Sequence, residues 1–122
     1  LNIDNITKAL GVVNYTDYFN LLDNLVLNNR EEAIKIIEEV YRSGKDLKQF
    51  IKQFLNFLID CNKYTLYSNF DYVNIPQTYA NRLNYQRDKL TYVTRRFANL
   101  DADLKYNQSP KSYIELYILM ME

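Results

Sequence analysis

The stretch DLKQFIKQFLNFLIDCNKYTLY, residues 46–67, decides the fold of this 122-residue chain. Asp46 is a good N-cap, and the residues after it predict one helix from Leu47 to about Tyr67. The apolar side chains of this helix form two faces, so we expect it in the middle of a bundle, with neighbours on both flanks. The first face holds Phe50, Ile51, Phe54, Leu58 and Cys61, and the second holds Leu55, Ile59 and Leu66.

Three shorter helices are predicted before this stretch. The first is a short amphipathic segment over residues 3–10. The second is capped by Asn14 or Thr16 and ends near residues 28–29. The third covers about residues 30–43 and is ended by Gly44, because glycine readily adopts the left-handed conformation that follows a helix.

After the long helix, residues 68–75 form the one clear loop, closed by Pro76. A short helical turn or two follows, and Asn84 is a candidate break before a further helix that runs to about Lys105. No alternating strand pattern of useful length occurs. We therefore expect an all-α fold, a compact bundle of five to six mostly antiparallel helices. The apolar residues of the helix ending near Lys105 follow a 3-4-3-4 spacing: Leu90, Val93, Phe97, Leu100 and Leu104.

The last helix is predicted from Ser109, a good N-cap, and Pro110, which suits the first helical position. It is apolar nearly all the way round, with Ile114, Tyr117 and Met121 on one face and Tyr113, Leu116 and Met120 on another. Such a helix must be covered by its own domain or by another molecule. The candidate subunit interface is therefore Tyr113, Leu116, Tyr117, Leu119 and Met120.

The composition excludes the common catalytic and cofactor sites. The chain has no histidine, one cysteine and two glycines, so it lacks nucleophilic triads, zinc-ligand sets and glycine-rich phosphate loops. We expect no catalytic, cofactor-binding or metal-binding residue in this chain. No signal peptide, transit peptide or membrane-spanning run is visible, which favours a cytoplasmic location. The chain begins at Leu1, so we expect it to be a piece of a longer protein.

A basic segment stands out although the formal net charge is zero. Its candidate patch is Arg82, Lys89, Arg95 and Arg96, and positions 82, 89 and 96 would share one side of a continuous helix. Such residues are most often a solvated helix face. The functional alternatives are a phosphate-binding patch or a surface for an acidic partner. With the tyrosines near it, segment 79–96 also suits a helical module that binds single-stranded nucleic acid.

Several motifs occur together in the order seen in one bacterial family. The stretch LDADLKYNQSPKSYIEL, residues 100–116, resembles the end of the collar domain (domain III) of the DNA polymerase III gamma/tau subunit. Upstream, YFNLLD (18–23) and EEA (31–33) resemble the first collar helices, and GKDLKQF (44–50) resembles the turn into the long helix. The delta-type clamp-loader subunits have similar collars and remain an alternative.

The resemblance implies a role in assembly. Proteins of this kind load the ring-shaped sliding clamp onto primed DNA with ATP bound in N-terminal AAA+ domains, and their third domains form a collar that holds the subunits in a ring. Residues 1–14 would be the end of the AAA+ lid domain, and residues 15–122 the collar domain. ATP and Mg²⁺ would then bind only upstream of this chain. The expected partners are other clamp-loader subunits (self, delta and delta-prime types), with DNA only indirectly involved and no membrane.

Overall fold

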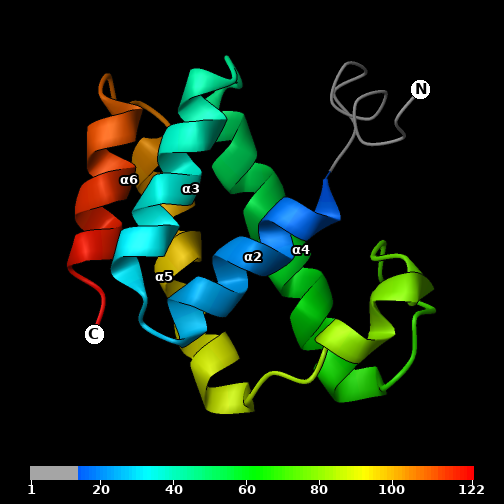
Figure 1. Cartoon of the computed structure of the whole chain (residues 1–122). Coiled ribbons are helices and arrows are strands. Elements are labelled where there is room, and N and C mark those ends of the chain that lie inside the picture. Colours follow the sequence, from blue (N-terminus) through cyan, green and yellow to red (C-terminus); the bar gives the residue numbers. More distant parts are fainter. Residues whose placement is uncertain (1–13) are drawn as a thin grey trace.

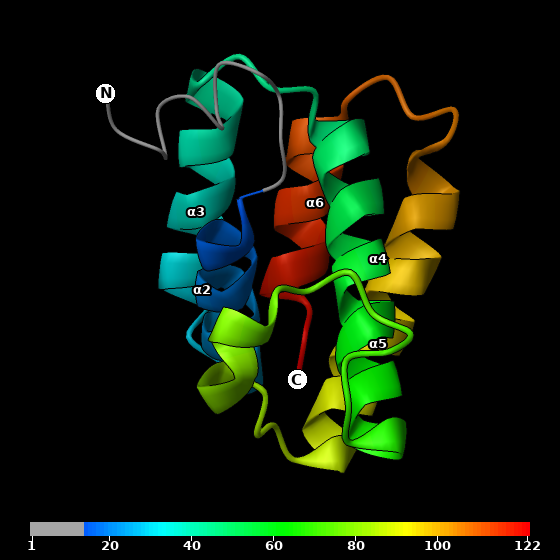
Figure 2. The same ribbon diagram turned by 90° about the vertical axis from the view of Figure 1, so that its right-hand side faces the viewer.

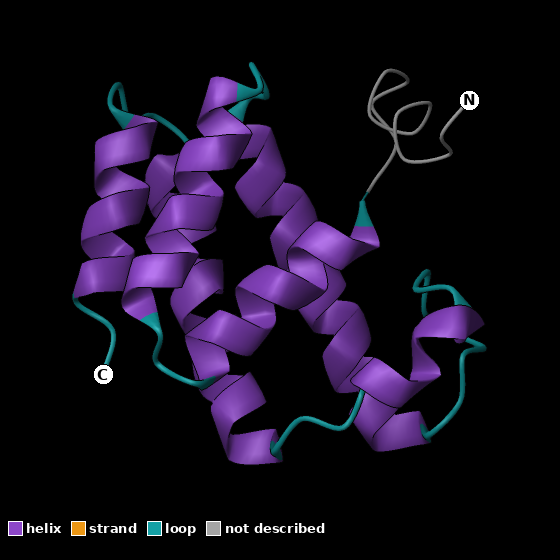
Figure 3. Cartoon of the chain, viewed as in Figure 1, coloured by secondary structure: helices purple, strands orange, loops and turns teal. Residues whose placement is uncertain are grey.

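The structure, a computed structural model, describes residues 14–122 (Figure 1). These residues form five α-helices and one 3-10 helix, and they contain no strand (Figure 3). The predicted all-α fold, a compact bundle of five to six helices, is therefore confirmed. The helices are α2 (Tyr15–Val26), α3 (Arg30–Arg42), α4 (Leu47–Tyr67), η1 (Gln77–Arg82), α5 (Arg87–Leu104) and α6 (Pro110–Leu119).

The helix ends follow local signals in the sequence. Asn14, one of the two predicted caps, accepts hydrogen bonds from the backbone N–H groups of Thr16 and Asp17 at the start of α2. Asp46 does the same for α4, accepting from Lys48 and from the residue after it. These contacts satisfy backbone donors that the first helical turn leaves free, and both helices therefore begin where the sequence predicts.

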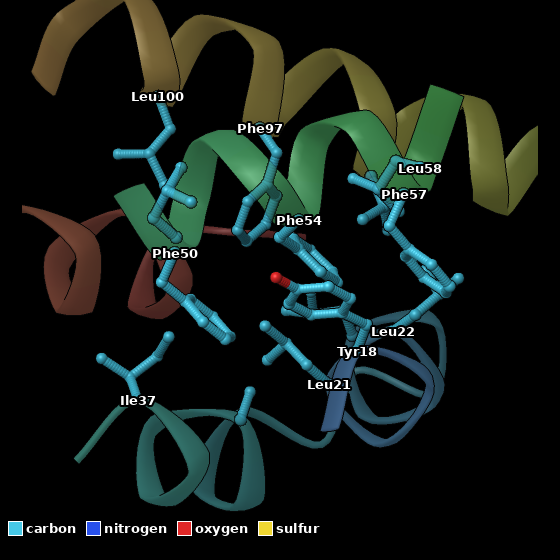
Figure 4. Close-up of a cluster of buried hydrophobic side chains, with 14 of the residues drawn as sticks. Tyr18, Leu21, Leu22, Ile37, Phe50, Phe54, Phe57, Leu58, Phe97 and Leu100 are labelled. Carbon is cyan, nitrogen blue, oxygen red and sulfur yellow. The ribbon is translucent and has the colours of Figure 1, made fainter. Parts of the chain in front are cut away.

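The bundle is built around α4 and α5, which pack along each other, while α6 lies beside α3 (Figure 2). The ring of Phe54 on α4 meets the ring of Phe97 on α5 edge to face, with centroids 5.1 Å apart. All five apolar residues that were expected to form the seam of α5 are buried. Figure 4 shows the core between these helices, to which α2 contributes Tyr18, Leu21 and Leu22, and α3 contributes Ile37.

The long helix α4 has neighbours on two flanks, but its second predicted apolar face is covered only in part. Its first predicted face is buried, but on the second face Ile59 is 41% exposed and Leu66 is 71% exposed. On one flank of α4 the Phe57 ring contacts Tyr18 of α2. On the other flank Asn62 donates a hydrogen bond to Thr94 of α5, on the same side of the helix as the half-buried Leu55. Phe57, which the sequence analysis did not place in the core, is 2% exposed.

The segment between α4 and α5 folds back onto α2. Ile75 and Leu83 are buried against the core, so each half of this segment has one residue that holds it in place. Asp23 of α2 accepts hydrogen bonds from Arg82 (2.8 Å) and from the Tyr85 hydroxyl (2.6 Å). These contacts fix η1 and the extended residues after it, so the helical turn predicted after Pro76 is confirmed as a separate 3-10 helix.

Two expectations fall on residues outside the described part of the chain. The amphipathic segment 3–10 is one, and the domain boundary between residues 1–14 and 15–122 is the other. Within residues 14–122, no helix combines the length and the apolar character needed to cross a membrane.

Candidate subunit interface

The last helix, α6, has one side in the core of the domain. Ile114 and Ile118 are fully buried, and Met121, just beyond the helix end, is 3% exposed. These residues are spaced by four and three positions, which places them on one side of the helix, facing α3 and α5. Pro110 stands at the first turn, as the sequence predicts, while Ser109 makes no side-chain capping bond. This side of α6 therefore completes the bundle.

The other side of α6 presents an apolar row to solvent. Leu116 is 53% exposed, Leu119 is 52% exposed and Met120 is 67% exposed. Leu119 and Met120 lie three and four positions after Leu116, which puts all three on the same side of the helix. Neighbouring exposed apolar side chains of this size mark surfaces that are covered by another molecule. We call these three residues the α6 row.

The two tyrosines of the predicted interface are held by their own domain. The Tyr113 hydroxyl donates a hydrogen bond to Asp103 on α5 (3.0 Å), and this bond raises the pKa of Tyr113. The guanidinium of Arg96 lies 4.3 Å from the centre of the Tyr117 ring. Both tyrosines are half-buried, and their rings contact each other at a centroid distance of 5.8 Å. They therefore lie beside the α6 row and hold α6 against α5.

Polar contacts fix α6 against α3 at both ends. Near the start, Lys111 forms an ion pair with Glu38 of α3 at 2.8 Å, and hydrogen bonds from Lys111 and Arg42 lower the pKa of Glu38. Near the end, Arg30 of α3 donates a hydrogen bond to the backbone oxygen of Leu119 (3.2 Å). The α6 row is therefore displayed on a helix whose position is set by its neighbours.

Arg96 of α5 lies against α6 beside Tyr117. Its Nη2 donates to the Tyr117 backbone oxygen at 3.4 Å, but its Nε is buried without a hydrogen-bond partner. No acidic side chain among residues 14–122 forms an ion pair with it. The guanidinium is therefore held inside the domain by the ring and the backbone oxygen of Tyr117.

The predicted basic patch does not form one row. Arg82 lies in η1 and Lys89 in α5, with extended backbone between them, so the expectation that positions 82, 89 and 96 share one continuous helix is wrong. The Asn84 region breaks the helix because Leu83 and Tyr85 turn inward against α2 and α4. Arg82 and Arg96 are occupied within the domain, while Lys89 and Arg95 are exposed on α5.

The tyrosines near this segment also have partners inside the domain. Tyr79 stacks on Phe19 with a centroid distance of 5.2 Å. Tyr85 is bonded to Asp23, and the Tyr92 hydroxyl accepts a hydrogen bond from the backbone N–H of Glu122. Rings held in this way are not arranged as a platform for stacked bases.

A groove near the end of the chain was missed by the sequence analysis. It has a volume of about 430 Å³ and lies between the end of α2 and the start of α5. Leu27, which is 72% exposed, stands at its edge, and Tyr92 and Glu122 line it. The sequence analysis placed Leu27 inside a helix that ends near residues 28–29, whereas α2 ends at Val26 and leaves Leu27 directly after it.

The comparison with protein families decides what kind of domain this is. A family model described as DNA polymerase III subunits gamma and tau domain III matches residues 1–97. The chain belongs to this family. The gamma/tau domain III match runs from the start of the chain into the middle of α5, so it includes α2, α3, α4 and η1. Searches of curated proteins and of solved structures found no match.

The α6 row lies outside the matched residues of this gamma/tau domain III. So do residues 100–116, which carried much of the resemblance in the sequence. The five residues of the predicted interface therefore remain a prediction that rests on their exposure and chemistry. Residues 14–122 contain no group of three or more His, Cys, Asp or Glu side chains placed to hold a metal ion.

Proposed function

We propose that this domain joins subunits of the bacterial DNA polymerase III clamp loader, as part of the collar that holds them in a ring. Its partners are other clamp-loader subunits, either copies of itself or the delta and delta-prime types. ATP and Mg²⁺ act in the AAA+ domains upstream, and this domain contributes assembly. Family membership supports the collar assignment, and the α6 row is the observation that carries the role in assembly.

A subunit within a ring needs two different contact surfaces, one for each neighbour. The α6 row suits one of them because it is apolar and stands on a helix that is fixed from behind by the core.

The size of the row sets the expected strength of the contact. Fully burying a Leu or Met side chain contributes roughly 1.5–3 kcal/mol, and these three are already about half covered. The row therefore contributes about 2–4 kcal/mol, which is less than the roughly 4–15 kcal/mol that association costs in lost translational and rotational freedom. We expect the isolated domain to associate only at high concentration, and the whole ring to depend on further contacts.

The test is a pair of variants, Leu116→Asp and Met120→Asp, studied by sedimentation velocity and by binding to purified clamp-loader subunits. A charge in the row should weaken association at least tenfold, while circular dichroism and the urea midpoint stay unchanged. Leu66→Asp is the matched control, because Leu66 is 71% exposed at the far end of α4. Ile118→Asp should instead unfold the domain, since Ile118 is fully buried.

Two results would count against the proposal. One is a wild-type domain that stays monomeric at millimolar concentration and also ignores the other clamp-loader subunits. The other is association that Leu116→Asp and Leu66→Asp weaken equally, because the effect would then come from added charge and not from the α6 row.

A further inference from the structure

A small pocket is lined by residues of α2, of α4 and of the segment that follows α4. Figure 1 shows α2 crossing α4 on the side of the bundle away from α6. The volume of the pocket is about 250 Å³. Three aromatic rings and three polar side chains form most of its lining. The rings are Tyr15, Tyr18 and Phe57, and the polar side chains are Gln53, Asn56 and Asp60.

Asp60 is the unusual member of this pocket. It is 6% exposed, and among residues 14–122 it is the only charged residue that is buried. One carboxylate oxygen, Oδ2, accepts a hydrogen bond from the backbone N–H of Asn74 at 3.1 Å. None of the ion pairs among the described residues includes Asp60. A buried carboxylate without a cation is costly, so the site favours a positive ligand.

The aromatic walls add to this preference. The Tyr18 ring centre lies 6.3 Å from that of Tyr15 and 5.5 Å from that of Phe57. The faces of such rings carry negative electrostatic potential and attract cations, most strongly when the site is shielded from water.

The two phenol hydroxyls of the pocket both donate to groups of the same domain. The Tyr15 hydroxyl donates to the backbone oxygen of Asn74 (3.1 Å), and the Tyr18 hydroxyl donates to Gln53 Oε1 (3.1 Å). Both phenol protons are therefore used within the domain. The second oxygen of Asp60 and the remaining lone pairs of Gln53 and Asn74 can still accept from a ligand.

We propose that this pocket binds the guanidinium group of an arginine side chain supplied by a partner protein. A guanidinium is planar, so it can lie flat against the half-buried Tyr15 ring, and its five N–H donors match a carboxylate with flanking amide oxygens. A lysine ammonium is more strongly hydrated and has no flat face to stack. The inference goes beyond the proposed role in assembly, since it needs neither the α6 row nor a ring.

The test is a titration of the isotopically labelled chain with blocked arginine (N-acetyl-arginine methylamide), followed by NMR. The expected result is a saturable shift of the Asn74 backbone amide and of the Gln53 and Asn56 side-chain amides, with a Kd of about 1–10 mM. Blocked citrulline has the same shape without the charge and should give no saturable shift. Blocked lysine should bind at least threefold more weakly than blocked arginine.

Two variants alter the pocket in opposite directions. Asp60→Asn keeps an oxygen for the Asn74 N–H but removes the charge, and should weaken arginine binding at least tenfold. Asn56→Asp adds a carboxylate and should strengthen binding about threefold. Since Asn56 is exposed, this second variant keeps the test decisive even where Asp60→Asn fails to fold.

Three results would overturn the proposal. The first is equal binding of blocked arginine and blocked citrulline. The second is arginine binding that neither variant changes, and the third is no saturable shift up to about 50 mM ligand, well above the expected Kd. Agmatine, a free alkylguanidine, tests the source of the ligand. If it binds tenfold more tightly than blocked arginine, the pocket serves a small molecule and the assignment to a protein partner is wrong.

Discussion

At the scale of single residues, buried phenols hold together parts of the chain that are distant in sequence. The Tyr85 hydroxyl bonds Asp23, which lies 62 positions earlier, and the Tyr18 hydroxyl bonds Gln53 on α4. Burial raises the pKa of both tyrosines above the ordinary value of 10.0, and for Tyr85 the hydrogen bond to Asp23 adds to this effect. Both groups therefore stay neutral in the folded state at a pH where free phenols begin to ionise.

This predicts a loss of stability at alkaline pH. The folded chain holds these phenol protons more tightly than the unfolded chain, so their contribution is complete below pH 10 and falls as the pH rises further. The limit is about 1.4 kcal/mol per pH unit for each tyrosine. Urea unfolding between pH 8.5 and 11 measures the slope, which Tyr18→Phe and Tyr85→Phe should each reduce. Tyr106→Phe, at a side chain that is 84% exposed, is the matched control. Equal slopes in all three variants would contradict this reading.

At the scale of the elements, two helix ends differ in how well their residues suit a left-handed backbone. Gly44 follows α3 with φ of 85°, and Ser68 follows α4 with φ of 58°. Glycine adopts this conformation freely, whereas a residue with a Cβ is strained there. A Cβ added at Gly44 would meet no atom within 4 Å, so its cost comes from the backbone alone.

The two positions give a paired prediction with opposite signs. Gly44→Ala should lower the free energy of unfolding by about 1–2 kcal/mol, and Ser68→Gly should raise it by about 0.5–1 kcal/mol. Urea midpoints with unchanged slopes would measure both. A Gly44→Ala chain as stable as the wild type would mean that the end of α3 relaxes into another conformation at no cost.

The elements also show what the sequence can and cannot reveal about the fold. The bounds of α4 and the seam of α5 were predictable because caps and apolar spacing are local signals. The exposure of Leu66 and the burial of Asp60 were not, since both depend on where the segment after α4 folds back. A straight helix drawn from Arg82 to Arg96 failed for the same reason, because contacts with Asp23 hold Arg82 elsewhere.

The candidate interface was predictable only in part. The sequence indicated that α6 has more apolar surface than one flank can bury, and Leu116, Leu119 and Met120 are indeed exposed. The sequence could not distinguish these three residues from Tyr113 and Tyr117, because all five occupy the same apolar part of the predicted helix. The difference lies in Asp103 and Arg96, two residues of α5 whose position beside α6 follows only from the tertiary fold.

At the scale of the whole molecule, α6 belongs to both the core and the surface. Its inner side covers the end of the bundle formed by α3 and α5, and its outer side carries the exposed row. The family match stops at residue 97, before α6 begins. Whether the helices before α6 are stable without α6 is a separate, physical question. The answer depends on how much apolar surface α6 buries in the folded chain.

We therefore expect a chain that ends at residue 108 to have a free energy of unfolding close to zero. It would lose Ile114, Ile118 and Met121, whose burial contributes about 5–9 kcal/mol in total, and it would expose the surfaces of α3 and α5 that α6 covers. A whole domain of this size is stable by only about 5–15 kcal/mol. The truncated chain should keep helical circular dichroism yet lose its near-ultraviolet signal and its cooperative urea transition. The full-length Leu116→Asp chain should keep all three, since only the outer side of α6 changes. If the truncated chain instead has the same urea midpoint as the wild type, the helices before α6 form a complete bundle by themselves. In that case α6 adds no stability to the domain and can detach from it together with the α6 row.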